Sequence, residues 1–88
     1  MTTVYLLHFD PPFKHARHYI GVTNRDDVQA RVAEHQRGEG AVLCRHARRA
    51  GCEIKLARTW PNVERRYELK LKGRSARPLC PICKAETA

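Results

Sequence analysis

Two short runs of β-branched, aromatic and apolar residues constrain the fold of this chain more than any other feature. The first run, TVYLLHF, covers residues 3–9, and the second, HYIGVT, covers residues 18–23. Between them the segment DPPFKHAR contains two successive prolines, which predict a loop. Strands joined by a short loop pair antiparallel by default, so the sequence predicts an N-terminal β-hairpin. Gly21 in the second strand indicates a bulge or a close approach to the backbone.

The residues after the hairpin predict a helix that ends at Gly38. On a helical wheel Arg31 and His35 lie within about 60° of Val28, at the edge of the apolar stripe. The helix therefore turns a cation and an imidazole toward the interior, just after a strand that carries Tyr19. Three residues are placed to cap the start of this helix, namely Asn24, Asp26 and Asp27.

Three further segments complete the expected domain. AVLCRHARRA (residues 41–50) predicts a short helix. CEIKLARTW (residues 52–60) alternates apolar and polar side chains, which predicts a half-buried strand that Pro61 ends. Asn62 is placed to cap a last helix over residues 63–73, in which apolar residues are spaced by four.

This layout predicts an α+β fold with the order β-β-α-α-β-α, in which helices flank a small, antiparallel, three-stranded sheet. We expect residues 1–72 to form one domain, because 88 residues, 42% of them hydrophobic, provide for a single small core. Prolines interrupt residues 73–88, which we expect to form an irregular tail containing CPIC. The first ten residues contain only the short apolar run VYLL and no basic leader, so we expect a cytoplasmic protein without a membrane partner.

The charge balance indicates the class of partner. The chain has 17 lysines and arginines, 12 of them arginine, against nine acidic residues, which gives a formal net charge of +8. Net charge bears on partners rather than on architecture, and the planar guanidinium binds phosphate through two parallel hydrogen bonds. We therefore expect a nucleic acid as the partner.

In strand context and spacing, the chain resembles the GIY-YIG nuclease domain superfamily. That family opens with a hairpin whose two strands carry the namesake tripeptides, and its next helix has an inward arginine and often a histidine one turn later. Here the second tripeptide is intact as YIG at residues 19–21, and TVY replaces the first but keeps Tyr5 at the aromatic position. Arg31 and His35 match the helical pair. The resemblance covers residues 3–72.

The resemblance implies a metal-dependent endonuclease that hydrolyses phosphodiester bonds in DNA, with RNA not excluded and with a possible protein partner that supplies specificity. Tyr5 would act as general base and Tyr19 would position water or phosphate, or these roles would be exchanged. Arg31 would stabilise the scissile phosphate, and a neutral His35 would accept the phenolic proton. The implied substrate contacts are Gly21, His18 and Arg74, with Ser75 and Arg77 as alternatives to Arg74 because GRSARP lacks the asparagine that many members use.

The resemblance also implies a glutamate that holds Mg²⁺ or Mn²⁺ from the last helix. Glu68 is followed by Leu-Lys-Leu-Lys and lies at the family's distance from the strand that ends at Trp60. Glu64 lies nearer the apolar stripe of that helix and is the alternative. The distance from the strand end and the following Leu-Lys favour Glu68, so we expect Glu68 to be the metal ligand. One carboxylate, with waters and phosphate oxygens, satisfies a hard cation.

Four cysteines raise a second metal expectation. Cys80 and Cys83 have the C-x-x-C spacing of half a zinc site, and they would need Cys44 and Cys52 to complete a structural Zn²⁺ site. The seven-residue gap between Cys44 and Cys52 is not a zinc-ribbon spacing, and both lie at apolar positions where a thiol acts as a small hydrophobe. The other histidines are expected on the surface or in loops, and these are His8, His15, His18 and His46. Among them His18, next to Tyr19, is the one expected to approach the site.

Two other functions compete with the nuclease. One is a module with the same fold that binds nucleic acid without cutting it, and the other is a zinc-stabilised interaction domain. The inward arginine and histidine favour the nuclease, since both groups would serve a phosphate and a phenol.

Overall fold

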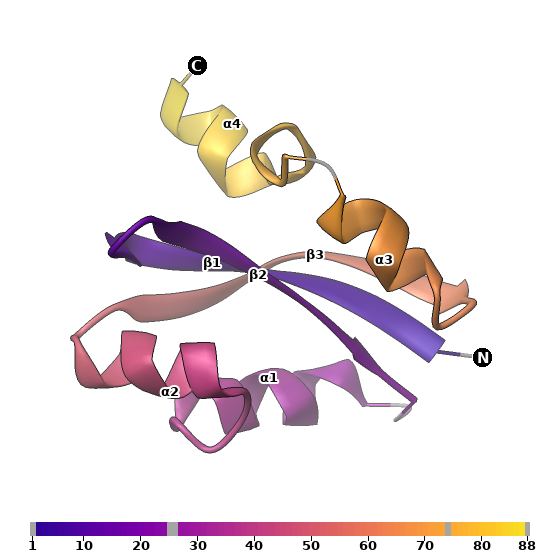
Figure 1. Ribbon diagram of the computed structural model, residues 1–88, viewed down its shortest axis with the longest axis horizontal. Helices are drawn as coiled ribbons and strands as arrows, with labels where there is room; N and C mark the ends of the chain where they lie inside the picture. Colours follow the sequence, from indigo (N-terminus) through magenta and orange to yellow (C-terminus); the bar gives the residue numbers. More distant parts are fainter. Residues whose placement is uncertain (1, 25–26, 74, 88) are drawn as a thin grey trace.

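The computed structural model describes residues 2–24, 27–73 and 75–87 and confirms the α+β class with a three-stranded antiparallel sheet. Helices lie on both sides of this sheet (Figure 1). In chain order the elements are β1 (Thr2–Phe13), β2 (Ala16–Thr23), α1 (Val28–Gln36), α2 (Val42–Arg49), β3 (Glu53–Val63), α3 (Tyr67–Lys72), the 3₁₀ helix η1 (Arg77–Leu79) and α4 (Pro81–Thr87).

The sheet has the order β2-β1-β3, so that the first strand of the chain is the central one. β1 pairs antiparallel with both neighbours, and its side chains from Val4 to Phe9 are all buried. In Figure 1 helices α1 and α2 lie below the sheet, whereas α3 and α4 lie above it. Because both faces of β1 are covered, its sequence reads as a continuous apolar run rather than as an alternation.

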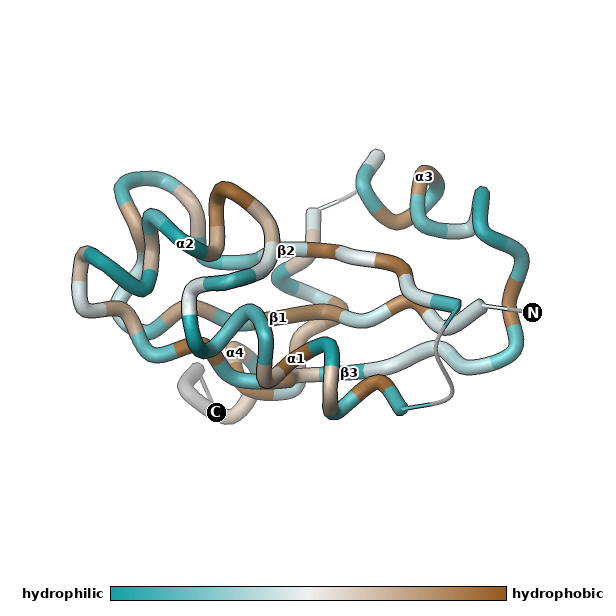
Figure 2. Tube along the Cα trace, turned by 90° about the horizontal axis from the view of Figure 1, so that it is seen from below, coloured by the Kyte–Doolittle hydropathy of each residue, from teal (hydrophilic) through white to brown (hydrophobic). Residues whose placement is uncertain are grey.

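Alternation along the strands divides the interior into two cores, one on each face of the sheet. The core between the sheet and helices α1 and α2 contains Tyr5, Leu7, Phe9, Val32, Cys44, Ala47, Cys52 and Ile54. The core between the sheet and helices α3 and α4 contains Val4, Leu6, Ile20, Leu71, Cys80 and Cys83. Figure 2 shows the hydrophobic colours concentrated along the strands, while α2 is largely hydrophilic.

The hairpin is tighter than the sequence predicts. Instead of a loop over residues 10–17, β1 continues through both prolines to Phe13, and β2 begins at Ala16. Phe13 pairs with Ala16, and the register shifts between His8 and Phe13. The prolines lie in that irregular stretch, beyond the last β3 partner of β1 at Asp10, so their missing N–H groups break no regular ladder.

The third strand is longer, and the third helix shorter, than predicted. β3 continues through Pro61 to Val63, where Thr2 donates its hydroxyl hydrogen to the Val63 carbonyl at 2.9 Å. β3 is an edge strand and therefore tolerates a proline. Asn62 has a φ of 57° inside the strand and does not cap a helix, because α3 begins only at Tyr67.

The first helix begins at one of the three residues that the sequence predicts as its N-cap. Asp27 is its N-cap and accepts a hydrogen bond from the Ala30 N–H at 3.3 Å, whereas Asn24 precedes the cap and Asp26 lies outside the described residues. The predicted irregular tail instead contains η1 and α4. None of the helices in the described part of the chain has the length and apolar character needed to cross a membrane.

Candidate active site

Three aromatic rings from three elements gather on the face of the sheet that α1 covers. Tyr5 pairs with Gly21, and Tyr19 pairs with Leu7, so the two tyrosines belong to the same face. The ring centroids are 6.5 Å apart for Tyr5 and Tyr19, 5.7 Å for Tyr5 and His35, and 5.4 Å for Tyr19 and His35. The structure thus brings together the two phenols and the imidazole that the sequence singled out.

His35 is held from both of its ring nitrogens. The Ala41 N–H donates to His35 Nδ1 at 3.2 Å, and His35 Nε2 lies 2.7 Å from Tyr5 Oη. Because Nδ1 is an acceptor, the proton of the neutral ring is on Nε2 and is donated to the phenol oxygen. This differs from the expectation that His35 accepts the phenolic proton. The ring instead donates a hydrogen bond to the Tyr5 oxygen and holds that phenol in position.

The protonation of His35 should make stability depend on pH. Its burial, with a further contribution from the Arg31 charge, lowers the pKa of His35 from 6.5 to about 4. In the unfolded chain the imidazole binds a proton below its ordinary pKa, so stability falls as the pH drops from 6.5 toward 4. We expect His35 to contribute a loss of about 2 kcal/mol in the free energy of unfolding between pH 7 and pH 5. Urea denaturation of the wild type and of H35Q at both pH values measures it, and an equal pH dependence in both proteins would contradict it.

Two glycines make room for these rings. A Cβ at Gly21 would overlap Tyr5 Cζ and Oη and lie 2.8 Å from Cε2, and a Cβ at Gly40 would overlap the His35 ring. The space beside Gly21 is therefore filled by Tyr5 and does not offer the predicted substrate contact. Gly40 was not among the predicted site residues, although the glycines of HQRGEG were visible in the sequence.

Arg31 lies beside the Tyr5 hydroxyl, one helical turn before His35. Its side chain is 29% exposed and forms an ion pair with Glu34 at 3.3 Å. Burial raises the pKa of Tyr5 to about 12, while the hydrogen bond with Arg31 and its charge act in the opposite direction. Burial also raises the pKa of Tyr19, and the nearby Cys44 adds to this effect. Both phenols are thus protonated near neutral pH, and Arg31 is the cation that favours a phenolate.

The two candidate glutamates differ in their surroundings. Glu68 is 17% exposed, pairs with Lys72 at 3.4 Å, and is near enough to Tyr19 for its charge to raise the pKa of that phenol. Glu64 is 65% exposed and pairs with Arg66 at 2.7 Å in the turn before α3. The lower exposure of Glu68 and the effect of its charge on Tyr19 distinguish it from Glu64.

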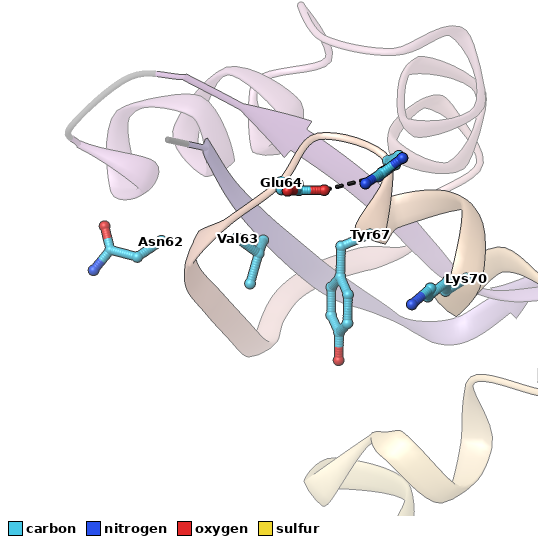
Figure 3. A pocket seen from close by; sticks show the side chains of 6 residues that line it. Asn62, Val63, Glu64, Tyr67 and Lys70 are labelled. Atoms are coloured by element: carbon cyan, nitrogen blue, oxygen red, sulfur yellow. Dashed lines mark hydrogen bonds and ion pairs between the residues drawn. The ribbon is translucent and has the colours of Figure 1, made fainter.

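The pocket of about 610 Å³ at the start of α3 is not part of the ring cluster (Figure 3). It is lined by Asn62, Val63, Glu64, Arg66, Tyr67 and Lys70. A second pocket of about 360 Å³ lies beside Glu68 and is lined by Arg65, Arg66, Glu68 and Leu69. The second pocket is the one that contains Glu68, together with two arginines.

The remaining predicted contacts are His18 and Arg74. His18 faces away from Tyr19, because neighbouring residues of a strand point to opposite faces, and it pairs with His8 on the α4 side. His18 is therefore wrong as a contact of this site. Arg74 lies outside the described residues, whereas Ser75 and Arg77 line a pocket with His18.

The four cysteines do not form one metal site. Cys44 and Cys52 lie in the core between the sheet and helices α1 and α2, and Cys80 and Cys83 lie in the core on the other face. The four-thiolate arrangement is therefore wrong.

A different group of four side chains can hold a metal ion. It consists of His8, His18, Cys80 and Cys83, whose donor atoms all lie within 4.8 Å of one another. His8 is fully buried and His18 is half-buried, rather than both lying on the surface or in loops. The sequence offered a signal for this group, since both histidines lie in the predicted hairpin strands.

The structure thus places Tyr5, Tyr19, Arg31 and His35 in one cluster, and the Glu68 charge contributes the smallest of the effects on the pKa of Tyr19. No protein-family model, curated protein or solved structure matches the chain. The chemistry of these side chains is therefore the basis on which a function is inferred.

Proposed function

We propose that the chain is a metal-dependent endonuclease of the GIY-YIG type that hydrolyses phosphodiester bonds in DNA. The observation that carries the proposal is the 2.7 Å contact of the buried Tyr5 hydroxyl with the His35 imidazole, next to Tyr19 and near enough to Arg31 for that cation to oppose the rise of the Tyr5 pKa. RNA is the alternative substrate, a protein partner would supply specificity, and the cytoplasm is the proposed location.

Arg31 suits the scissile phosphate. Its guanidinium is permanently charged, is partly exposed, and presents a planar set of N–H donors to phosphate oxygens. Because the site is partly closed to water, the attraction between this cation and the charge that develops on the phosphate oxygens is stronger than in bulk water. Arg31 would therefore bind the phosphate more tightly in the transition state than in the ground state.

Tyr5 and Tyr19 would position and activate the attacking water. Tyr5 Oη accepts the His35 Nε2–H, which leaves the phenolic hydrogen directed away from the imidazole. Since its pKa is raised to about 12, Tyr5 orients the water in the free protein rather than deprotonating it. Added positive charge at the site would lower this pKa and make the phenolate a base.

Glu68 fits a hard divalent cation. Its carboxylate is largely enclosed, and its partner Lys72 is 49% exposed and able to turn away. When bound, Mg²⁺ or Mn²⁺ supplies a Lewis acid for phosphate oxygens and for a coordinated water. Arg65 and Arg66 line the pocket beside Glu68, and this local positive charge, together with the net charge of +8, supports a polyanionic substrate.

Nicking of supercoiled plasmid DNA tests the proposal. We expect nicking with Mg²⁺ and none with excess chelator. E68Q should lower the rate by about 100-fold or more, because it removes the proposed carboxylate ligand. E64Q is the matched control on the same segment, and it should change the rate less than about threefold.

Two outcomes would overturn this assignment. A chain that binds DNA with a salt-dependent affinity but never nicks it is a binding module instead. If E64Q were inactive and E68Q active, the nuclease would stand but its metal ligand would be Glu64.

A further inference from the structure

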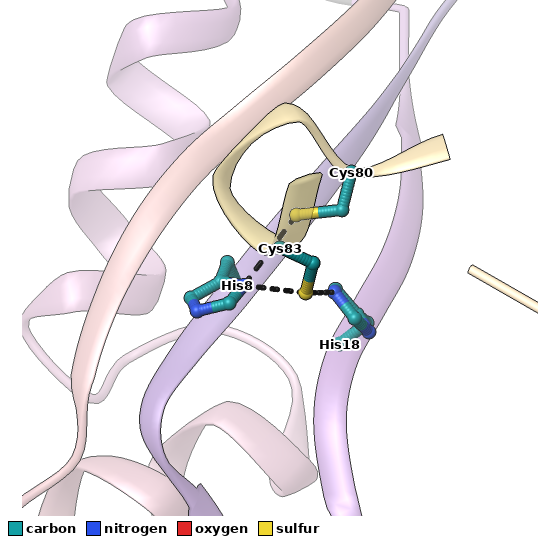
Figure 4. Close-up of side chains that lie close together, drawn as sticks. All are labelled: His8, His18, Cys80 and Cys83. Atoms are coloured by element: carbon teal, nitrogen blue, oxygen red, sulfur yellow. Dashed lines mark hydrogen bonds between the residues drawn. The ribbon is translucent and has the colours of Figure 1, made fainter. Parts of the chain in front are cut away.

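Two imidazoles and two thiols meet on the face of the sheet opposite the tyrosine cluster (Figure 4). His8 and His18 occupy paired positions on β1 and β2, and their ring centroids are 5.3 Å apart. Cys80 directly follows η1, and Cys83 belongs to α4. The donor atoms therefore come from three separate parts of the chain.

Three sulfur–nitrogen distances among these atoms match the edges of a ligand tetrahedron. Cys80 Sγ and Cys83 Sγ lie 3.4 and 3.5 Å from His8 Nδ1, and Cys83 Sγ lies 3.3 Å from His18 Nε2. Zinc bonds of about 2.3 Å to sulfur and about 2.0 Å to nitrogen separate such ligands by about 3.5 Å in a tetrahedron. Three edges therefore already match a tetrahedral zinc site, and all four donor atoms lie within 4.8 Å of one another.

We propose that His8 Nδ1, His18 Nε2, Cys80 Sγ and Cys83 Sγ bind one structural Zn²⁺ ion. The set of two thiolates and two imidazoles is a common structural zinc donor set. His8, Cys80 and Cys83 are buried, and four protein ligands leave no position for substrate. This site is separate from the proposed nuclease centre, and it stands or falls independently of it.

Hydrogen bonds from the two thiols to the two imidazoles, without a metal ion, explain the arrangement less well. Cys83 faces two imidazole nitrogens, and His8 Nδ1 faces two sulfurs. A thiol has one proton and can donate it to one imidazole at a time. A cation at the centre would instead use the lone pairs of all four atoms simultaneously.

The charges near the site are compatible with the ion. Arg17 and Arg77 line a pocket of about 240 Å³ that also contains His18 and Cys83 and that gives an ion a path of entry. Two thiolates neutralise Zn²⁺, so the occupied site adds no net charge beside these arginines. Arg17 Nη1 lies 3.4 Å from His8 Nε2 and donates to the Phe9 carbonyl at 3.3 Å. If the ion binds Nδ1 of His8, Nε2 would keep the proton, and Arg17 would then donate to the Phe9 carbonyl alone.

The ion would attach the C-terminal segment to the hairpin. Cys80 and Cys83 are 72 and 75 positions from His8. α4 has seven residues, which is too short for a helix to be stable by itself in water. Coordination would couple its folding to that of the sheet, as structural zinc sites do.

Metal analysis of the full chain, purified without chelator, tests the proposal. We expect about one zinc ion per chain, and Co²⁺ in its place should give the visible absorption of a tetrahedral ion with thiolate charge transfer. C83A and H18A should lose both signals. C52A is the matched control, since Cys52 is a buried thiol on the other face of the sheet and should retain them.

A second measurement remains informative if C83A or H18A fails to fold. In C83H a fourth ligand is kept, so Co²⁺ should still bind tetrahedrally but with weaker thiolate bands. Chelation of the wild type should lower Tm by about 10 °C or more, and Zn²⁺ but not Mg²⁺ should restore it. A folded wild-type chain that carries no zinc and gives no tetrahedral Co²⁺ spectrum overturns the proposal, as does a Cys80–Cys83 disulfide in the purified protein or equal zinc loss in C52A.

Discussion

R31A should lower the rate of plasmid nicking by about 1000-fold or more. The guanidinium is the permanent cation beside the Tyr5 hydroxyl, and arginines that stabilise a phosphate in the transition state contribute factors of this size. R31K should restore only part of the rate, because an ammonium group has the charge but not the planar pair of donors. Single-turnover rates at saturating enzyme measure the effect without a contribution from DNA affinity.

A surface arginine provides the control for this experiment. Arg49 is exposed at the end of α2, and R49A removes the same formal charge from the protein. We expect R49A to reduce DNA affinity slightly and the single-turnover rate less than about threefold. R31A should also raise the pKa of Tyr5 further, which ultraviolet titration of the phenols detects in the absence of DNA. Equal rates for R31A and R49A would remove Arg31 from the proposed mechanism.

G21A should destabilise the protein by about 3 kcal/mol, at the upper end of the usual cost of overpacking a core. The added methyl group would occupy the space of the Tyr5 ring, which is buried and has paired backbone on both sides. Neither the central strand nor the ring can move far, because the ring also contacts His35. Urea denaturation at pH 7 measures the free energy of unfolding.

Two comparisons isolate the cause. At Gly73, with φ of −77°, the nearest atom to a Cβ is the Leu69 carbonyl oxygen at 3.6 Å, so G73A should cost less than about 0.5 kcal/mol. In a Y5L background, where the ring is absent, the cost of G21A should fall below about 1 kcal/mol. If the cost were unchanged in Y5L, the contact with Tyr5 would not be the reason for the glycine.

Local periodicity predicted that Arg31 and His35 share the inward face of the first helix, whereas Tyr5 and Tyr19 were implied by the resemblance to the GIY-YIG family. Residues two apart in a strand share a face, and residues four apart on a helix share a face, so the strands and the first helix determined which side chains point inward. The role of His35 could not be predicted in the same way. Its tautomer depends on the N–H of Ala41, whose position is set by the turn after α1.

The ends of several elements could not be predicted from local signals. The prolines at both ends of the sheet predict the ends of strands, yet β1 continues past Pro12 and β3 past Pro61. The effect of a proline depends on whether its nitrogen would have faced a neighbouring strand. That requires the strand order β2-β1-β3, which no single segment contains.

The sequence by itself determined the hairpin, the inward Arg31 and His35, and the basic character of the surface, because side-chain periodicity and charge are properties of neighbouring residues. Only the tertiary structure decided which thiols lie together. Cys44 and Cys52 lie on one face of the sheet, while Cys80 and Cys83 lie beside His8 and His18 on the other. Residues more than 60 positions apart come into contact only when the whole chain has folded. The face of the sheet on which they meet follows from the packing of both cores.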